Sequence, residues 1–373
     1  MGFPPGHEQP PAVVPSPVSK EGAGPPPVDV TPWQYQPPWD PLRARREQRE
    51  RSLANLKRRA KQFGAFCSLS LFFYLAIALF AMILMTPETM QRLDAAAPSS
   101  RLGVLFVITP SIVPIMNISG LALVCFFILL VLAITVSYLY AMGESLYASI
   151  NELILGRPRR HSTILTIGGL FFAMLAINVI YYTLVESSGV SPNVPDFESE
   201  PLWESVYGFA KASVWEEIIV RVLFIGVPLL WIDLLLRRGQ LLQPIRYFAG
   251  GGMKFGFVEC ALIAFSAVMF GLGHMQAWDF WKVIPTIITG LCFGYLYVRI
   301  GLYAAIIFHF SFDFLEIPVR YFGDAVTVAL GLLSLLWLVA GLIFIIYYSM
   351  QLARFLRGKV LSHEDASPQT PQP

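Results

Sequence analysis

The chain has 373 residues, of which 55% are hydrophobic and only 14% are charged. An ordinary soluble domain carries about 25% charged residues, so this composition excludes a soluble globular protein. The formal net charge is +2, but the segment 43–61 holds nine Lys and Arg residues against Glu47 and Glu50, a local charge of 9 − 2 = +7. The basic charge is therefore concentrated at one place.

Residues 1–62 are expected to form a disordered Pro-rich tail followed by a basic juxtamembrane helix. The tail has strings of proline and few aliphatic residues, a composition that cannot bury a core. The basic block directly precedes the first apolar run, where a cytoplasmic anchor that faces anionic lipid is the usual arrangement. We therefore expect membrane lipids, and no nucleic acid, as partners.

Apolar runs of about 20 residues, the length that crosses the hydrocarbon core of a bilayer, recur along the chain. They predict an all-α fold, a polytopic transmembrane helix bundle of about eight spans within residues 63–350. The segment 102–116 is short and contains Pro110 and Pro114, so it is expected to be a re-entrant or interfacial piece. Residues 351–373 are expected to be a disordered cytoplasmic tail. The expected spans are 63–85, 119–141, 163–185, 212–236, 256–274, 282–298, 301–317 and 326–350.

The charges between these spans predict an orientation. Lys and Arg fall on one side of an eight-span bundle, whereas the connection between the third and fourth spans carries acidic residues and no Lys or Arg. This asymmetry predicts an integral multi-pass protein of the cell membrane with both termini in the cytoplasm. It also places Glu216 in the outer half of the membrane, ~30 Å of helix from Arg237.

Ionisable side chains in the fourth span mark a candidate site, because such a group costs a few kcal/mol inside a membrane. Glu217 and Arg221 are four residues apart, so they can form an ion pair on one face of the helix. Glu216 lies about 100° away around the helix. It therefore needs a partner from another helix.

Two later spans carry histidine. His274 ends the fifth span, and His309 lies four residues before Asp313 in the seventh, so that Asp313 can orient His309 or share a ligand with it. Glu216 can take a proton from water while the two imidazoles polarise a carbonyl or hold an oxyanion. Glu216, His274 and His309 could instead bind zinc with an open fourth position.

Three motifs follow in chain order: Glu216-Glu217-x-x-x-Arg221, Phe270-x-x-x-His274 and His309-x-x-x-Asp313. Together they resemble the CPBP intramembrane protease family, which includes the CAAX prenyl endopeptidases of the Rce1 type and the bacterial Abi proteins. The resemblance covers about residues 160–320, the expected protease core. It implies that Glu216 activates the water, that His274, His309 and Asp313 complete the catalytic site, and that Glu217 and Arg221 support it. The CAAX-processing branch usually ends the third motif in Asn, where this chain has Asp313.

The resemblance favours a glutamate-activated water without a metal or other cofactor, and the chain has no HExxH motif. The expected function is a CAAX-protease-like intramembrane endopeptidase that cleaves membrane-associated peptide or protein substrates, some of them lipidated. Two alternatives stay open: a transporter or channel that uses intramembrane Glu, His and Arg, and a non-catalytic membrane scaffold. No internal repeat is evident, which favours the enzyme over a transporter. The sequence predicts no particular oligomeric state.

Overall fold

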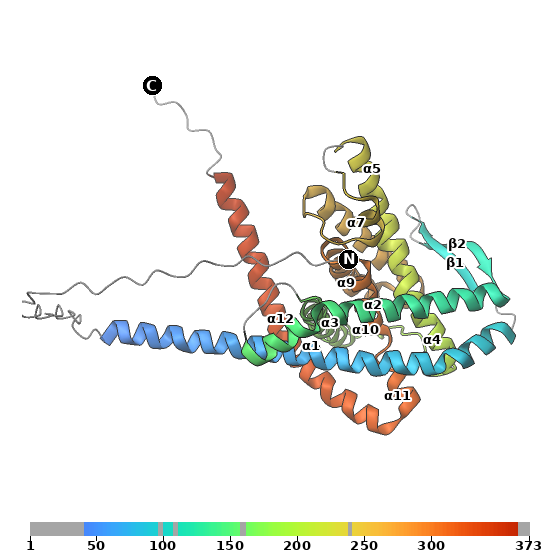
Figure 1. Ribbon diagram of the computed structural model, residues 1–373, viewed down its shortest axis with the longest axis horizontal. Coiled ribbons are helices and arrows are strands. Elements are labelled where there is room, and N and C mark those ends of the chain that lie inside the picture. The colour runs from blue at the N-terminus through green and yellow to red at the C-terminus, as the bar shows by residue number, and fades with distance from the viewer. Residues whose placement is uncertain (1–40, 96–99, 107–110, 157–161, 238–240, 365–373) are drawn as a thin grey trace, which may run out of the picture. The chain divides into compact units, whose positions relative to one another are not determined.

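The computed structural model describes residues 41–95, 100–106, 111–156, 162–237 and 241–364. The chain divides into two units at residue 52, so that the start of the first helix, residues 41–52, is separate from the described residues that follow. Residues 1–40 of the predicted Pro-rich tail and residues 365–373 of the predicted C-terminal tail lie outside the described residues. The rest of the predicted disordered tail 351–373, residues 351–364, is helical and continues α12 (Asp324–Glu364). The described part is helical almost throughout (Figure 1), so the prediction of an all-α bundle is confirmed.

The elements follow one another in the order α1 (Pro41–Ala95), β1 (Ser100–Phe106), β2 (Ser111–Ile118), α2 (Gly120–Leu155), α3 (Thr163–Ser187), α4 (Leu202–Lys211), η1 (Ala212–Glu216), η2 (Ile218–Gly226), α5 (Val227–Leu235), α6 (Pro244–Ala249), α7 (Phe257–Gly273), α8 (Met275–Trp278), η4 (Phe280–Lys282), α9 (Val283–Arg299), α10 (Leu302–Asp313), α11 (Ile317–Phe322) and α12 (Asp324–Glu364). η1 and η2 are π-helical, and η4 is a 3₁₀ turn.

Seven helical stretches within the described residues are long and apolar enough to cross a membrane, one fewer than predicted. The predicted span 301–317 contains α10, whose 12 residues make a helix of ~18 Å, shorter than the ~30 Å hydrocarbon core. Every residue from Ala304 to Ser311 is buried, because α10 packs against α2, α3, α9 and η1. A helix enclosed by other helices does not have to reach both membrane surfaces.

The fourth span begins at Leu202, ten residues before the predicted start at 212. Charged residues made this stretch resemble a loop in the sequence, but the helix accommodates both of them. Glu204 lies in the first turn of α4, where the helix dipole favours an acid, and the Lys211 Nζ lies 5.8 Å from the centre of the Tyr207 ring. Glu216 consequently lies well inside the helical stretch rather than near its start.

Residues 102–106 and 111–116 belong to two paired β-strands rather than to a further helix. β1 and β2 pair in antiparallel register, from Ser100 opposite Ile118 to Phe106 opposite Ser111. The segment predicted to be re-entrant or interfacial is therefore a two-stranded sheet, the one departure from helix among the described elements.

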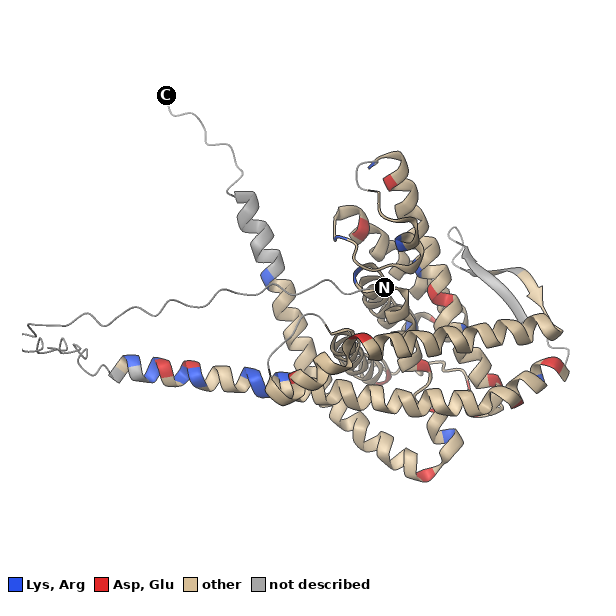
Figure 2. Cartoon of the chain, in the orientation of Figure 1, with Lys and Arg blue, Asp and Glu red and all other residues tan. Residues whose placement is uncertain are grey.

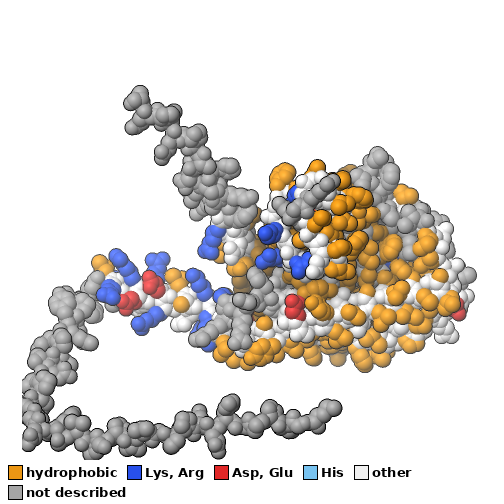
Figure 3. All heavy atoms as spheres, turned by 45° about the horizontal axis from the view of Figure 1, so that its top comes forward, with side chains coloured by type: hydrophobic (Ala, Val, Ile, Leu, Met, Phe, Trp, Pro, Cys, Tyr) orange, Lys and Arg blue, Asp and Glu red, His pale blue; other side chains and the backbone are white. Residues whose placement is uncertain are grey.

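The charges of α1 lie towards its ends, and the stretch between them is uncharged (Figure 2). The buried positions of this stretch recur every three or four residues, which is the spacing of one helical face. Among them are Cys67, Leu71, Leu75, Ala78 and Met82. The opposite face exposes Phe73 and Phe80, and apolar side chains cover much of the bundle in Figure 3. Such a surface suits contact with lipid.

A turn of three glycines closes the end of α9. Gly250, Gly251 and Gly252 have φ of 71°, 86° and 66°, a region that side chains other than glycine rarely adopt. The N–H groups of Gly251 and Gly252 donate to the carbonyls of Tyr297 and Arg299 at 2.9 and 3.1 Å. The turn thus satisfies carbonyl groups that a helix end leaves without partners.

Gly226, the last residue of η2, tests how closely η2 packs against α6. A Cβ at Gly226 would lie 1.9 Å from the carbonyl oxygen of Tyr247, so we expect Gly226→Ala to lower the free energy of unfolding by about 1–3 kcal/mol. Gly143→Ala is the matched control, because no atom lies within 4 Å of its Cβ position and a helix favours Ala over Gly. Thermal unfolding of the purified proteins measures the difference. Equal midpoints for the two variants would contradict the packing of η2 on α6.

Candidate active site

The helical stretch from Leu202 to Leu235 changes its winding where the polar residues lie. α4 is followed by η1 and η2, two π-helical segments that meet at Glu216 and Glu217. A π turn holds an extra residue, closes i to i+5 hydrogen bonds and is frequent at functional sites. At this junction the Glu216 side chain is 33% exposed, whereas Glu217 is fully buried. Adjacent carboxylates therefore have different surroundings.

Glu217 is the centre of a buried polar network. Its Oε2 accepts a hydrogen bond from Arg221 Nε at 3.0 Å, and its Oε1 lies 3.0 Å from Nδ1 of His309. A carboxylate can only accept, so Nδ1 of His309 carries the donated proton. The pair with Arg221 is the one that the four-residue spacing predicts. The bond to His309 was not predicted, because the sequence offered Asp313 as the group that orients this ring.

A second set of groups encloses the guanidinium of Arg221. Its Nη1 donates to Ser266 Oγ at 2.6 Å, and Ser266 Oγ donates to the Val220 carbonyl at 2.8 Å. The rings of Phe270 and Phe293 lie 5.0 and 5.1 Å from its Cζ. Nη2 has no hydrogen-bond partner among the described residues, so the two rings compensate for part of its lost hydration.

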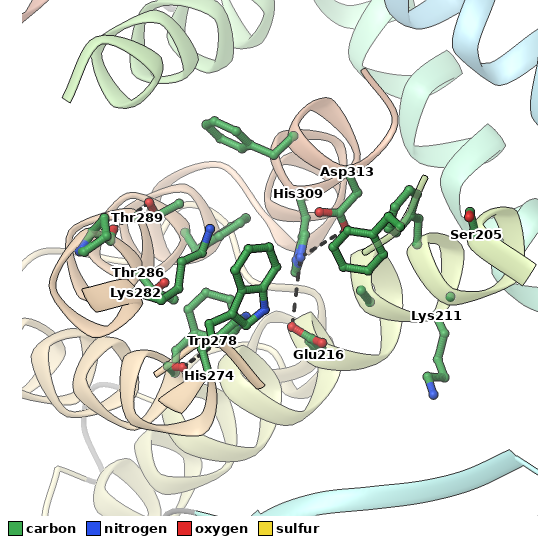
Figure 4. Close-up of a pocket in the computed structure, with 18 of the residues that line it drawn as sticks. Ser205, Lys211, Glu216, His274, Trp278, Lys282, Thr286, Thr289, His309 and Asp313 are labelled. Atoms are coloured by element: carbon green, nitrogen blue, oxygen red, sulfur yellow. Dashed lines mark hydrogen bonds and ion pairs between the residues drawn. The ribbon is translucent and has the colours of Figure 1, made fainter. Parts of the chain in front are cut away.

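The other nitrogen of His309 faces two further carboxylates. Nε2 lies 3.4 Å from Oδ2 of Asp313 and 4.0 Å from Oε2 of Glu216. Ser213 Oγ lies 3.4 Å from the same Asp313 oxygen. Figure 4 shows the side chains of Glu216 and Asp313 approaching the imidazole from different elements. His309 is therefore held by Nδ1 inside the bundle and presents Nε2 to the carboxylates.

His274 forms the C-cap of α7 and is held in a similar way. Its Nδ1 lies 2.8 Å from the carbonyl oxygen of Phe270, which can only accept, so Nδ1 is the donor. The imidazole also packs edge-on against the Phe270 ring, with 4.7 Å between the centroids. Nε2 is left for other partners.

One cavity of about 500 Å³ contains all four residues predicted to be catalytic, Glu216, His274, His309 and Asp313. Its other walls include side chains that the sequence did not single out, both aromatic and polar. Among them are Phe197, Phe209, Trp278, Lys282, Thr286 and Phe312. The supporting residues Glu217 and Arg221 lie behind the cavity wall and are fully buried.

Several of these contacts carried little signal in the sequence. Ser266 is a serine within an apolar run, which is common in membrane helices, and only its contact with Arg221 distinguishes it. Lys282 and Thr286 are four residues apart at the start of a predicted span, a spacing that could have indicated a shared helical face. Their position opposite His309 depends on how α9 and α10 pack, which spacing alone does not give.

The proposed zinc ligands do not form a coordination site. No group of three His, Cys, Asp or Glu residues in the described part of the chain is arranged to hold a metal ion. Nδ1 of His309 is engaged by Glu217, and Nδ1 of His274 by a backbone carbonyl. These hydrogen bonds leave Nε2 of both rings as the nitrogen that could bind a metal, and histidines that bind metals commonly donate the other ring nitrogen in this way. A metal-dependent reaction therefore stays a prediction for chelation to test.

Residues 198–315 match the family model described as Type II CAAX prenyl endopeptidase Rce1-like. The chain carries an Rce1-like segment. The predicted resemblance is thus confirmed, and the matched residues include all three motifs. No curated protein and no solved structure matches the chain. Together with the seven apolar helical stretches, the match supports an integral multi-pass membrane protein with an Rce1-like segment.

The Rce1-like core should depend on the buried ion pair. Arg221→Ala leaves the Glu217 carboxylate without its cation, so we expect a loss of about 3–5 kcal/mol in the free energy of unfolding and a lower folded yield. The double variant Glu217→Gln/Arg221→Gln should lose less, because no lone charge stays buried. Arg354→Ala, at an exposed position of α12, is the control and should change stability by less than about 0.5 kcal/mol. Thermal midpoints of Arg221→Ala and Arg354→Ala that agree would contradict this role.

Proposed function

We propose that the chain is an intramembrane endopeptidase in which Glu216 activates the hydrolytic water. The observation that carries the proposal is the position of Glu216, partly exposed in the cavity with its Oε2 4.0 Å from Nε2 of His309. This distance is too long for a direct hydrogen bond and suits a bridging water. The Rce1-like match supports a peptidase over the transporter and scaffold alternatives.

In the proposed reaction the Glu216 carboxylate takes a proton from water, and the resulting hydroxide attacks the carbonyl carbon of the scissile peptide. The tetrahedral intermediate carries a negative oxygen that needs donors aimed at it. His274 and His309 can supply N–H groups from Nε2 when that nitrogen is protonated. The carbon–nitrogen bond then breaks, and the proton held by Glu216 passes to the leaving amine. Atoms and charges balance without a covalent intermediate.

The neighbouring groups have positioning roles in this proposal. Glu217 fixes the orientation of the His309 ring through Nδ1, and Arg221 keeps the Glu217 carboxylate charged and in place. Asp313 Oδ2 lies 3.4 Å from Nε2 of His309. Its negative charge can stabilise a proton bound to Nε2 between turnovers. These residues fix the positions of the groups around the reacting atoms. Such positioning can accelerate a reaction as much as the base itself does.

For the substrate, we propose a membrane-associated peptide or protein, with a prenylated peptide as the first candidate because of the family description. The aromatic walls of the cavity suit an apolar segment. We place the protein in the cell membrane, in contact with lipid, with the N-terminus in the cytoplasm. The C-terminus lies there too if the segment that contains α10 crosses the membrane as an eighth span, and on the opposite side if only the seven long stretches cross. The exposed basic part of α1 supports this orientation, because such segments favour the cytoplasmic, anionic surface of a membrane.

The role of Glu216 predicts a specific kinetic defect. Glu216→Gln keeps the shape of the side chain but removes the basic oxygen, so kcat should fall about 10²- to 10⁴-fold while KM changes little. Cleavage of a quenched fluorescent, farnesylated peptide by the purified protein measures both constants. Glu204→Gln, which removes another carboxylate lining the cavity, is the control and should keep most of the activity. Wild-type kcat in Glu216→Gln would exclude the proposed base.

Chelation separates the two ways of activating water. The metal-free mechanism predicts full activity after exhaustive treatment with a strong zinc chelator. Inactivation by the chelator, recovery on adding zinc, and about one tightly bound zinc per chain would contradict it and favour the set of Glu216, His274 and His309.

The proposed orientation predicts which segments are accessible from outside the cell. A protease-sensitive tag inserted before Arg43 should be protected in intact cells, whereas a tag between Ser187 and Glu200 should be cut. A tag after Lys359 should be protected if the segment that contains α10 crosses the membrane, and cut if only the seven long stretches cross. The reverse pattern would show that the bundle is inserted the other way.

A further inference from the structure

The wall of the cavity formed by η4 and α9 carries hydrogen-bond donors that the proposed reaction does not use. Lys282, Thr286 and Thr289 all line the cavity, and their spacing of four and three residues places them on one helical face. Figure 4 shows these three side chains together, across the cavity from Ser205 and Lys211. These side chains line the same cavity as the reacting groups but have no role in the proposed reaction.

The side chain of Lys282 is held in place by two indole rings. Its Nζ lies 4.2 Å from the centre of the Trp278 ring and 5.4 Å from that of Trp281. Trp281 is itself fixed, because its Nε1 donates to the carbonyl of Asn193 at 3.1 Å. Within the described part of the chain, the Lys282 ammonium forms no ion pair, and Asp313 lines the same cavity. A cation is thus positioned without an acceptor.

Thr286 supplies a second donor without a partner. The residue is only 6% exposed, and its hydroxyl forms no hydrogen bond within the part of the chain that the structure describes. Thr289, one turn further along α9, differs because its hydroxyl donates to the Pro285 carbonyl at 2.8 Å. The Thr286 oxygen is not one of the buried side-chain atoms that lack a partner, so it is accessible from the cavity, where a ligand or water can accept a hydrogen bond from it.

We propose that Lys282 and Thr286 bind a carboxylate of the substrate, which is either the free C-terminus of a peptide or an acidic side chain close to the scissile bond. This inference rests on the proposed function, since it names the part of the substrate that the α9 wall recognises. A carboxylate accepts hydrogen bonds only, and it would pair with the ammonium and the hydroxyl at the same time. The bound group would fix the position of the peptide relative to Glu216, so that these two residues determine specificity and are not catalytic.

The test uses the full-length protein in lipid nanodiscs and three labelled farnesylated peptides. The first has a free C-terminal carboxylate and no acidic side chain, the second is its C-terminal amide, and the third is the amide with a Glu near the C-terminus. Equilibrium binding is measured with Glu216→Gln, and kcat and KM with the otherwise unchanged protein. We expect a peptide with the recognised carboxylate to bind about 10- to 100-fold more tightly than the plain amide.

The variants test the two donors separately. Lys282→Met should remove the preference for the carboxylate while leaving kcat for the plain amide unchanged, and Lys282→Arg should retain most of the preference. Thr286→Val should reduce the preference for the carboxylate peptide over the plain amide about 3- to 10-fold. Lys211→Met is the matched control, because this lysine also lines the cavity but its ammonium points away from His309 in Figure 4. Lys211→Met should keep the full preference.

Each outcome decides the inference. Tighter binding of the first peptide identifies the C-terminus as the recognised group, and tighter binding of the third identifies an acidic side chain. Equal binding of all three peptides would overturn the proposal. So would an equal fall in kcat for every peptide in Lys282→Met, which would make this lysine a counter-ion for Asp313. Selective binding of a carboxylate without cleavage of any peptide would uphold the binding site and refute the proposed peptidase function.

Discussion

The carboxylate of Glu217 is the constraint around which the site is built. It lies in the bundle with no exposed surface, and it accepts from Arg221 on one oxygen while the other faces His309, both at 3.0 Å. A buried charge is tolerated only when it is paired and hydrogen-bonded. The bundle meets this requirement by bringing η2, α7 and α10 together at one point, since Ser266 of α7 binds the same arginine. The position of the His309 ring follows from that arrangement.

Adjacent residues in the same helix thereby acquire different chemistry. Both oxygens of Glu217 have hydrogen-bond partners. Glu216 instead has an oxygen at the edge of the cavity, 4.0 Å from Nε2 of His309. Two carboxylates in different surroundings can serve as one fixed charge and one base, a division of roles known from other hydrolytic enzymes. The π-helical winding on both sides of this junction is the local feature that accompanies the division.

The sequence was sufficient for the features that depend on local spacing or on overall composition. It predicted the pair of Glu217 and Arg221, the closeness of His309 and Asp313, the helical bundle and the family of its central segment. It missed features that depend on packing between distant segments. The contact between Glu217 and His309 joins residues 92 positions apart. The short α10 resembled a full span because apolar residues continue on both sides of it, and the β-hairpin has no hydropathy signal that separates it from a short membrane segment.

The orientation of His309 by Glu217 can be measured directly by ¹⁵N NMR of the histidine-labelled protein. The chain has only five histidines, and a His309→Asn variant assigns the signal of interest. The account predicts that Nδ1 of His309 is protonated and that its hydrogen-bonded proton signal is lost or shifted in Glu217→Gln. A neutral His309 ring with its proton on Nε2 and a bare Nδ1, unchanged in Glu217→Gln, would contradict the arrangement on which the proposed site depends.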